Sequence, residues 1–66
     1  MIQFGDVIRA RRKEMGISQN KLADMAHVHR QTIIRIELNQ SSARFDVILD
    51  VLHALGLDLE VVEWTQ

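Results

Sequence analysis

Apolar and polar residues are spaced along most of the chain with the period of an α-helix. Apolar residues recur three and four positions apart in residues 3–15, which predicts a first helix with one buried face. The same spacing predicts a second helix that follows Ser18 and stops near residue 26, and a third over residues 29–38. Residues 40–44 have the composition of a loop, and a fourth amphipathic helix is expected over residues 45–55.

Residues that favour helix boundaries stand at the expected positions. Gly16 and Gly56 suit the ends of the first and fourth helices, because glycine adopts the left-handed conformation without steric cost. Asn39 can end the third helix in the same way. Ser18 is a good cap for the second helix, because its side-chain oxygen can accept a free backbone N–H.

The period changes in the last residues. Residues 57–61 alternate apolar and acidic side chains, which is typical of a half-buried β-strand. A lone strand leaves its backbone groups unpaired, so we expect the same strand of another copy to pair with it across a two-fold axis. A tail packed on its own domain and a fifth short helix are the alternatives. Residues 1–56 are thus expected to form the folded domain and residues 57–66 a dimerisation segment, with Leu57, Leu59 and Val61 on the dimer strand.

The second and third predicted helices are separated by a gap that is too short for a loop. Two helices joined by a turn of about three or four residues, with polar side chains at the start of the later helix, form the layout of a helix-turn-helix. The later helix of such a unit lies in the major groove of DNA, where its first side chains reach base edges. The sequence therefore predicts a DNA-binding unit within residues 17–37.

The composition narrows the class of protein. The chain has 66 residues and no cysteine, so its core is small and neither a disulfide nor a thiolate metal site can stabilise it. Oligomerisation is then the expected source of added stability. No apolar run approaches the roughly 20 residues that span a membrane, and residues 1–13 lack the apolar core of a signal peptide, so a cytoplasmic protein is expected.

The net charge of −1 conceals an uneven distribution. Residues 1–44 contain all eight Lys and Arg residues and four acidic ones, a balance of +4, whereas residues 45–66 contain five acidic residues and no Lys or Arg, a balance of −5. A basic segment followed by an acidic one suggests a nucleic-acid-binding face and a separate face for another purpose, although uneven charge also arises by chance in small proteins.

Within the predicted unit, the sequence ISQNKLADMAHVHRQTIIRIE resembles the helix-turn-helix of the Xre/Cro/C1 repressors. The matching positions are Ser18, Gln19, Leu22, Ala23, Val28, Thr32, Ile33, Ile36 and Glu37. The resemblance extends over residues 4–57, and the short length and alternating tail make the chain most similar to HipB-like antitoxin regulators. It implies an all-α, lambda-repressor-like domain of four to five helices, with a short C-terminal β-strand that pairs across a dimer.

One position departs from the family pattern. His27 stands in the turn where the family usually has glycine, at a position that generally requires a positive φ. Histidine is among the residues that tolerate this conformation, at a cost of about 1 kcal/mol. We therefore expect the turn to be retained, with its detailed geometry open.

The resemblance also assigns residues that read DNA bases. They lie at the start of the second helix, at the start of the third helix and one turn later: Gln19, His29, Arg30, Gln31 and Arg35. Their chemistry suits the role, because arginine can pair with guanine O6 and N7, and glutamine with adenine N6 and N7. Ile34 lies next to the face shared by Gln31 and Arg35, and it either touches a thymine methyl group or covers a neighbouring residue.

A second group of residues is expected to position the domain on the phosphate backbone. Backbone amides at the start of the second helix suit an anion. The expected phosphate-binding residues are Ser18, Thr32, Asn39, Gln40, Ser41 and Arg44, with Gln19 placed to contribute and Arg9, Arg11 and Lys13 as further basic candidates. For each of them a solvated helix face is the alternative.

Arg12 and Glu37 match a pair that the family uses within the fold. In the family, an arginine late in the first helix pairs with the glutamate at the end of the recognition helix. Both positions match here, so the resemblance assigns Arg12 and Glu37 to a structural salt bridge.

The sequence contains little that suggests catalysis or metal binding. His27 and His29 offer two ligands near Asp24, but a metal site needs three or four converging ligands with supporting contacts. Paired carboxylates, a serine with a histidine base and a glycine-rich phosphate loop are not recognisable. We expect no enzyme activity, no catalytic residue, no metal and no cofactor.

Together these features predict a sequence-specific transcriptional repressor that binds double-stranded DNA as a homodimer on a palindromic operator. By resemblance it is the HipB-like antitoxin of a toxin–antitoxin pair, which regulates its own operon and has a HipA-like kinase as partner. The alternative is a protein-binding antitoxin or interaction module whose main role is to bind and neutralise a partner protein through its acidic tail and fourth helix. No membrane is expected among its partners.

Overall fold

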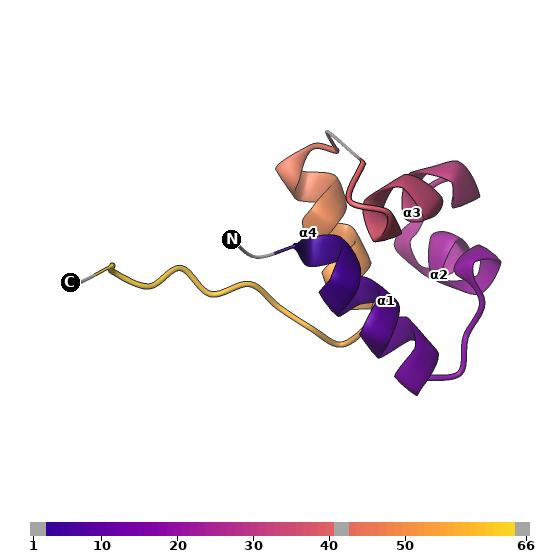
Figure 1. Cartoon of the computed structure of the whole chain (residues 1–66), viewed down its shortest axis with the longest axis horizontal. Coiled ribbons are helices and arrows are strands. Elements are labelled where there is room, and N and C mark those ends of the chain that lie inside the picture. The colour runs from indigo at the N-terminus through magenta and orange to yellow at the C-terminus, as the bar shows by residue number, and fades with distance from the viewer. Residues whose placement is uncertain (1–2, 41–42, 65–66) are drawn as a thin grey trace.

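The computed structural model describes residues 3–40 and 43–64, and these residues form four helices (Figure 1). The helices are α1 (Phe4–Glu14), α2 (Gln19–Ala26), α3 (Arg30–Glu37) and α4 (Phe45–Ala54). Each lies within one residue of the range that the apolar spacing predicts, so the all-α prediction is confirmed for the helical domain. A fifth helix is not found among the described residues.

The core lies where the four helices face one another. α2 packs against both α3 and α4, and α1 packs against α3. The largest fully buried side chains come from all parts of the domain: Ile8, Leu22, Ile33, Val51 and Leu55. Truncating a buried aliphatic side chain of this kind to alanine typically costs about 2–5 kcal/mol. The apolar faces predicted from the sequence therefore meet in one core.

Every described helix is followed by a residue with left-handed backbone conformation. The φ angles are 70° at Gly16, 59° at His27, 57° at Asn39 and 72° at Gly56. In each case the next residue donates its backbone N–H to the carbonyl oxygen five positions earlier, and these bonds join Ile17 to Arg12, Val28 to Ala23, Gln40 to Arg35 and Leu57 to Leu52. This ending is the Schellman motif, which satisfies carbonyl groups that a helix end leaves free. The predicted helix ends and the positive φ of His27 are confirmed.

Asn39 also joins the end of α3 to the start of α1. Its Oδ1 accepts the backbone N–H of Gly5 at 3.1 Å, and its Nδ2 donates to Asp6 Oδ1 at 3.2 Å. The two helices approach so closely that a Cβ atom on Gly5 would collide with the carbonyl oxygen of Ile36 and lie 2.5 Å from Asn39 Oδ1. The absence of a side chain at Gly5 therefore allows α1 to approach the end of α3 closely.

A buried ion pair connects α1 to α3. The side chains of Arg12 and Glu37 are 12% and 3% exposed, and Arg12 contacts both carboxylate oxygens, with Nε 2.6 Å from Oε2 and Nη2 3.0 Å from Oε1. Arg12 Nη1 also donates to the carbonyl oxygen of Ile17 at 3.0 Å, which holds the segment that leads into α2. The hydrogen bond to Glu37 raises the pKa of Arg12 above its usual value, although burial acts in the opposite direction. The structural salt bridge implied by the resemblance is present.

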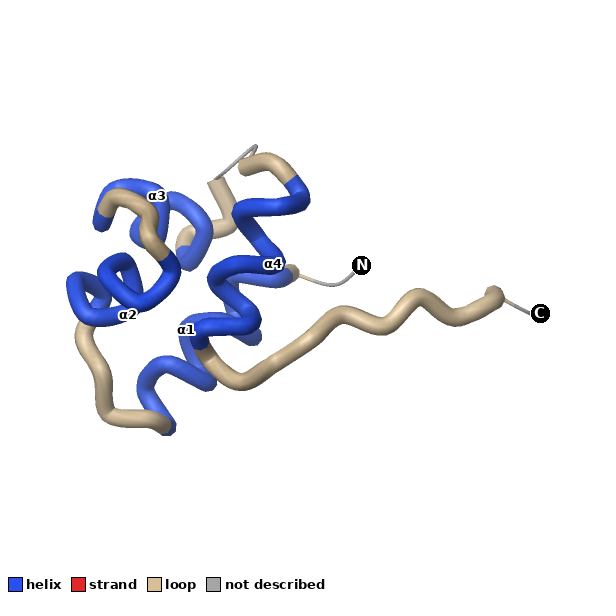
Figure 2. The backbone as a smooth tube through the Cα atoms, turned by 180° about the vertical axis from the view of Figure 1, so that it is seen from behind, coloured by secondary structure: helices blue, strands red, loops and turns tan. Residues whose placement is uncertain are grey.

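Residues 57–64 extend away from the helical domain (Figure 2), and the described part of the chain contains no β-strand. Leu57 and Leu59 are half-buried and pack against the core, whereas the acidic residue after each of them is exposed. The predicted alternation is therefore present, but its apolar side faces the chain's own domain, as the packed-tail alternative expects. Val61 is 89% exposed. A strand forms only when a second strand accepts and donates its backbone hydrogen bonds, and the structure describes one copy of the chain. Pairing between two copies therefore stays a prediction.

Replacing His27 with glycine should stabilise the protein. His27 is exposed, and its left-handed conformation costs a non-glycine residue about 1 kcal/mol. The melting temperature, followed by circular dichroism, should rise by roughly 4–8 °C for a domain of this size. Asn39→Gly is the matched control, because it relieves the same strain but removes the side-chain bonds to Gly5 and Asp6, and it should not stabilise. A melting temperature of His27→Gly at or below that of the wild type would contradict the expectation.

Removing one partner of the buried ion pair should be costly. Arg12→Met leaves the Glu37 carboxylate buried without its cation, which should lower the free energy of unfolding by about 3–5 kcal/mol. Arg12→Met combined with Glu37→Leu removes both charges and should recover most of that loss. Urea unfolding of the three proteins gives the comparison, and equal stability of the wild type and Arg12→Met would exclude a structural role for the pair.

Candidate nucleic-acid interface

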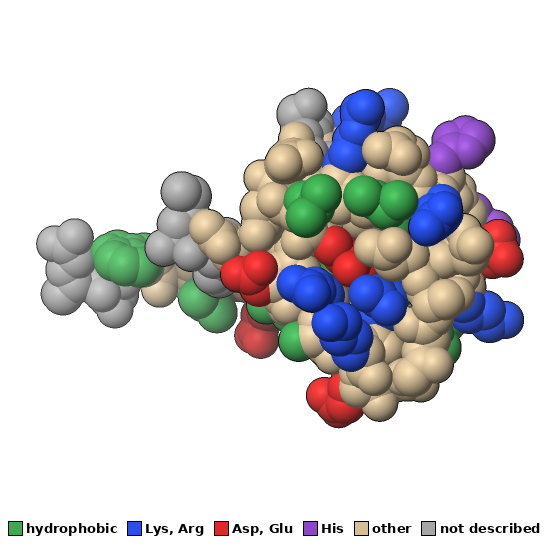
Figure 3. Space-filling model, turned by 45° about the vertical axis from the view of Figure 1, so that its right-hand side comes forward, with side chains coloured by type: hydrophobic (Ala, Val, Ile, Leu, Met, Phe, Trp, Pro, Cys, Tyr) green, Lys and Arg blue, Asp and Glu red, His purple; other side chains and the backbone are tan. Residues whose placement is uncertain are grey.

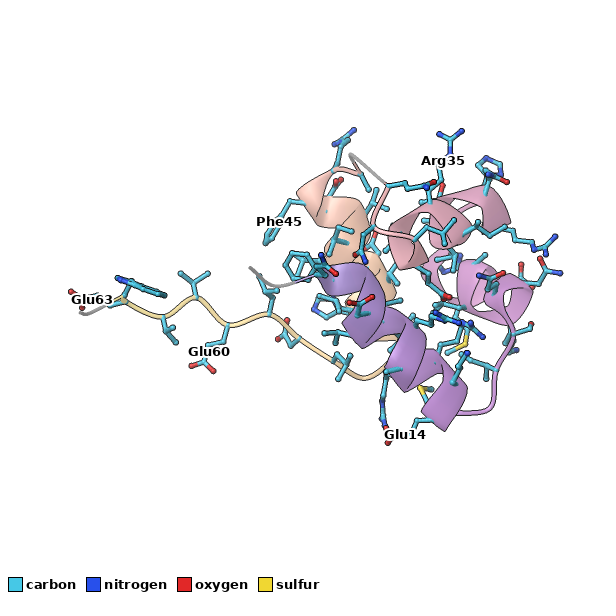
Figure 4. All side chains as sticks on the ribbon, in the orientation of Figure 1. Glu14, Arg35, Phe45, Glu60 and Glu63 are labelled. Carbon is cyan, nitrogen blue, oxygen red and sulfur yellow. The ribbon has the colours of Figure 1, made fainter. Side chains whose placement is uncertain are left out.

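Helix α3 turns one face to the core and the other to solvent. Ile33 and Ile36 are buried, whereas Arg30, Gln31 and Arg35 are exposed. Figure 4 shows the Arg35 side chain pointing away from the domain. Within the described part of the chain, none of these three polar side chains has a hydrogen-bond partner or an ion pair. They are therefore free to contact a ligand outside the domain.

The segment between α2 and α3 sets the direction of this exposed face. Ser18 Oγ accepts the backbone N–H of Lys21 at 3.0 Å, so it caps α2 as predicted. The chain turns at His27, and Val28 then packs against the core. His29 is the N-cap of α3 and makes no capping bond through its side chain. Its exposed imidazole consequently lies beside the first residues of α3.

Gln19, the first residue of α2, is bonded to the end of α3. Its Nε2 donates to Glu37 Oε1 at 3.3 Å, the same oxygen that Arg12 Nη2 contacts. The side chain is half-buried, and its amide oxygen accepts no hydrogen bond from the residues that the structure describes. The buried pair thus orients Gln19, while the amide oxygen stays available to an outside donor. Base reading by Gln19 and by the α3 residues stays a prediction.

Two of the predicted phosphate-binding residues use their side chains within the fold. Ser18 caps α2, and Asn39 bonds to the start of α1. The bonds from Asn39 to α1 were not predicted from the sequence, because the start of α1 is distant from Asn39 along the chain. Phosphate contacts of Ser18 and Asn39 stay predictions. The backbone amides at the start of α2, beside Ser18, suit an anion, whereas the backbone N–H of Asn39 already donates to the carbonyl oxygen of Ile36 at 3.0 Å.

The other predicted phosphate-binding residues lie beyond the end of α3 or on its flank. Gln40 and Arg44 are exposed, and the Arg44 side chain, 83% accessible, pairs with Asp46 at 3.2 Å. Thr32 is half-buried. Ser41 falls outside the described residues. Because an exposed ion pair is worth little, Arg44 can exchange Asp46 for another anion.

Unpaired cations surround the helix-turn-helix. Among the described residues, the basic side chains that take part in no ion pair are Arg9, Lys13, Lys21, Arg30 and Arg35. Arg11 differs from them, because it pairs with Glu14 at 2.9 Å and its Nε donates to the carbonyl oxygen of Leu55 at 3.0 Å. Arg11 therefore links α1 to the end of α4. Figure 3 shows a face of the molecule on which Lys and Arg side chains gather beside apolar ones.

A surface hollow of about 310 Å³ lies between α1, the start of α2 and the end of α3. Basic side chains of α1 line it, together with Gln19, Glu37, Ile34 and Leu38. Leu38 is 58% exposed although its side chain is large and apolar. The exposure of Leu38 was not predicted from the sequence, in which this residue marks only the end of a helix. Its spacing of four residues from Ile34 is the signal that places it on the exposed face.

Outside this interface, the titratable residues of the described chain either bond to another residue of the fold or lie too far apart to form a shared site. No group of three or more His, Cys, Asp or Glu residues converges there in a way that could hold a metal ion. His53 Nε2 lies 2.9 Å from Asp58 Oδ1, and this bond, together with one from the backbone N–H of Leu59, lowers the pKa of Asp58. The contact links the start of the tail to α4. None of the described helices has the length and apolar character needed to cross a membrane.

Comparisons with known proteins agree with this geometry. A family model described as helix-turn-helix matches residues 8–62. An uncharacterized HTH-type transcriptional regulator of Sinorhizobium fredii is 31% identical over 59 residues, which cover 89% of this chain and 78% of that protein. A second HTH-type transcriptional regulator, from Methanothermobacter thermautotrophicus, is 40% identical over 50 residues, which cover 76% of this chain and 72% of that protein.

The matched residues include α2, the turn at His27, α3 and α4. The resemblance drawn from residues 17–37 is thereby confirmed at the level of the family. The chain belongs to the Xre/Cro/C1-type helix-turn-helix family of DNA-binding transcriptional regulators.

Proposed function

We propose that this protein is a sequence-specific repressor that binds double-stranded DNA with α3 in the major groove. The observation that carries the proposal is the exposed and unpaired set of Arg30, Gln31 and Arg35 on a helix whose opposite face is buried. The major groove, about 12 Å wide, admits an α-helix of this kind. Repression follows from occupancy, because a protein bound across a promoter excludes other proteins from the same DNA.

The three polar side chains of α3 suit different bases. Arg30 and Arg35 can each donate two parallel hydrogen bonds to O6 and N7 of guanine, and Gln31 can pair with N6 and N7 of adenine. Each good pair is worth about 1–3 kcal/mol of discrimination against a wrong base. The pair of Arg12 and Glu37 supports this readout, because it fixes α3 against α1.

Contacts to the DNA backbone are expected at both ends of the unit. The N-terminus of α2 presents backbone amides near Lys21, while Gln40 and Arg44 follow α3. Such contacts position the domain and carry no base information. With a net charge of −1, the non-specific affinity should be modest, since that contribution grows with the number of phosphates neutralised.

The dimeric state belongs to the same proposal. Val61, Val62 and Trp64 are 89%, 73% and 83% exposed, on a tail that also carries Glu60 and Glu63 (Figure 4). Three large apolar side chains exposed within four residues favour an interaction site. Antiparallel pairing of two tails would satisfy their backbone groups and cover these side chains.

A two-fold dimer has consequences for the operator. Two copies of α3 related by the axis would read half-sites whose centres lie about 34 Å apart, one turn of the double helix. The operator should therefore be near-palindromic. An apolar groove of about 220 Å³, lined by Phe4, Val7, Leu52, Leu57 and Leu59, lies at the base of the tail and could receive the partner's apolar side chains.

The tail also favours a second candidate function, that of an antitoxin. Val61, Val62 and Trp64 are exposed, and this part of the tail lies away from α3 (Figure 1). A HipB-like antitoxin with a HipA-like kinase as partner would use the tail for the kinase and α3 for DNA, so both functions are compatible. The alternative of an interaction module that does not bind DNA is less favoured, because it does not explain why α3 exposes three long polar side chains without partners.

Arg35→Ala should lose affinity for the operator without loss of the fold. Arg35 is exposed and unpaired, so its removal costs the domain little, whereas a lost base contact should weaken binding about 5- to 150-fold. The measurement is a fluorescence-anisotropy titration with a duplex from upstream of the protein's own gene and a scrambled duplex, at several salt concentrations. Arg44→Ala is the control for a backbone contact, and it should weaken both duplexes alike and lower the salt slope by about one. Wild-type affinity of Arg35→Ala for the operator would remove Arg35 from the readout.

Charged substitutions in the tail should weaken the dimer. Val61→Asp with Val62→Asp leaves Leu57 and Leu59 packed on the domain but places two charges where the second tail is expected. Sedimentation velocity should show a dimer for the wild type and a monomer for this variant and for a chain that lacks residues 58–66. Emission from Trp64, the single tryptophan, should shift to shorter wavelength as the wild type is concentrated. A truncated chain that still sediments as a dimer would rule out tail pairing.

A further inference from the structure

We propose that Ile34 and Leu38 form an apolar contact that reads thymine methyl groups in the operator half-site. The inference rests on the proposed binding of α3 in the major groove and adds a specificity-determining pair to it. Ile34 and Leu38 are one helical turn apart, and the backbone N–H of Leu38 donates to the carbonyl oxygen of Ile34 at 3.1 Å. Their side chains therefore lie next to each other at the end of α3, where Leu38 is the C-cap.

Neither side chain is needed in the core. The buried core and the partly buried apolar residues packed against it include neither Ile34 nor Leu38. Leu38 is 58% exposed and Ile34 is partly exposed. Ile34 is thus not among the residues that pack against the core, and of the two roles that the sequence leaves open for it we propose the contact to a thymine methyl group.

The apolar pair lies on the same face as the polar readout. Residue spacings of three and four connect Gln31, Ile34, Arg35 and Leu38 into one patch on a helix with 3.6 residues per turn. A helix that places Gln31 and Arg35 against base edges consequently brings Ile34 and Leu38 to the same groove. If a protein partner covered Ile34 and Leu38 instead, it would also keep Gln31 and Arg35 out of the major groove.

The charge around the pair identifies DNA as the occupant. Arg9 and Lys13 line the same hollow and have no ion-pair partner in the described chain. The one carboxylate in the hollow, that of Glu37, is neutralised by Arg12 at 2.6 Å. Free lysine and arginine around a small apolar floor match a phosphate backbone flanking an apolar group, whereas protein interfaces are depleted of lysine.

Thymine supplies the apolar group. Its C5 methyl is the apolar feature that a base edge presents in the major groove, and aliphatic side chains contact it. Deoxyuridine keeps the hydrogen-bonding groups of thymidine and lacks that methyl group. Replacing thymidine by deoxyuridine at a contacted position should therefore weaken binding by about three- to tenfold.

The experiment begins with selection of tight-binding duplexes from a random-sequence library by the full-length wild-type chain. Each thymidine in one half-site of the selected duplex is then replaced singly by deoxyuridine, and affinities are measured by fluorescence anisotropy. We expect one or two positions at which the wild type discriminates against deoxyuridine. Ile34→Ala and Leu38→Ala should lose this discrimination at their own positions while still binding the duplex.

Phe45→Ala is the matched control. Phe45 is 58% exposed, the same fraction as Leu38, and lies on α4 (Figure 4). It should keep the full preference for thymidine. Tight wild-type binding with no loss at any deoxyuridine position would overturn this inference alone, as would discrimination that survives in the Ile34→Ala, Leu38→Ala double variant. Failure of the library to yield any preferred duplex would overturn the proposed function and this inference together.

Discussion

The orientation of α3 depends on one buried carboxylate. Glu37, the last residue of α3, is 6% exposed, and an uncompensated charge at that depth would cost several kcal/mol. Arg12 of α1 bonds both of its oxygens, Gln19 of α2 donates to one of them, and Arg12 also holds the Ile17 carbonyl. α1, the start of α2 and the segment between them are thus all connected to the C-terminal end of α3. Any rotation of α3 would break charged hydrogen bonds, so its exposed side chains keep a defined direction, as base recognition requires.

Helices as short as these depend on their ends and their packing. The four helices contain 8 to 11 residues, lengths at which isolated helices do not persist in water. A left-handed residue after each helix turns the chain back toward the core within a few residues, so apolar faces meet without long loops. His27 adopts the left-handed conformation although a residue with a side chain disfavours it, because the turn must return Val28 to the core. At Asn39 the same conformation is accompanied by bonds to Gly5 and Asp6, which recover part of its cost.

The uneven charge of the sequence corresponds to a spatial division of the molecule. The unpaired cations lie on α1, α2 and α3, around the exposed face of the recognition helix. The acidic residues of the second half lie on α4 and along the tail, where Asp58 is held by His53. The proposed contacts to DNA and to a protein partner are therefore compatible, because the opposite charges that they would use lie on different parts of the molecule. The tail leaves Val61 and Trp64 exposed, and this is where we propose that a second chain packs.

The sequence by itself determined the four helices, their ends and the helix-turn-helix. Each of these depends on local spacing and on residues such as Ser18, Gly16 and Asn39, whose preferences act within a few positions. Only the tertiary structure decided which side chains remain free. It committed Arg11 to the end of α4 and Asn39 to the start of α1, and it left Leu38 exposed beside Ile34. It also directed Leu57 and Leu59 toward their own core. These outcomes depend on contacts between residues far apart in the chain, which periodicity does not encode.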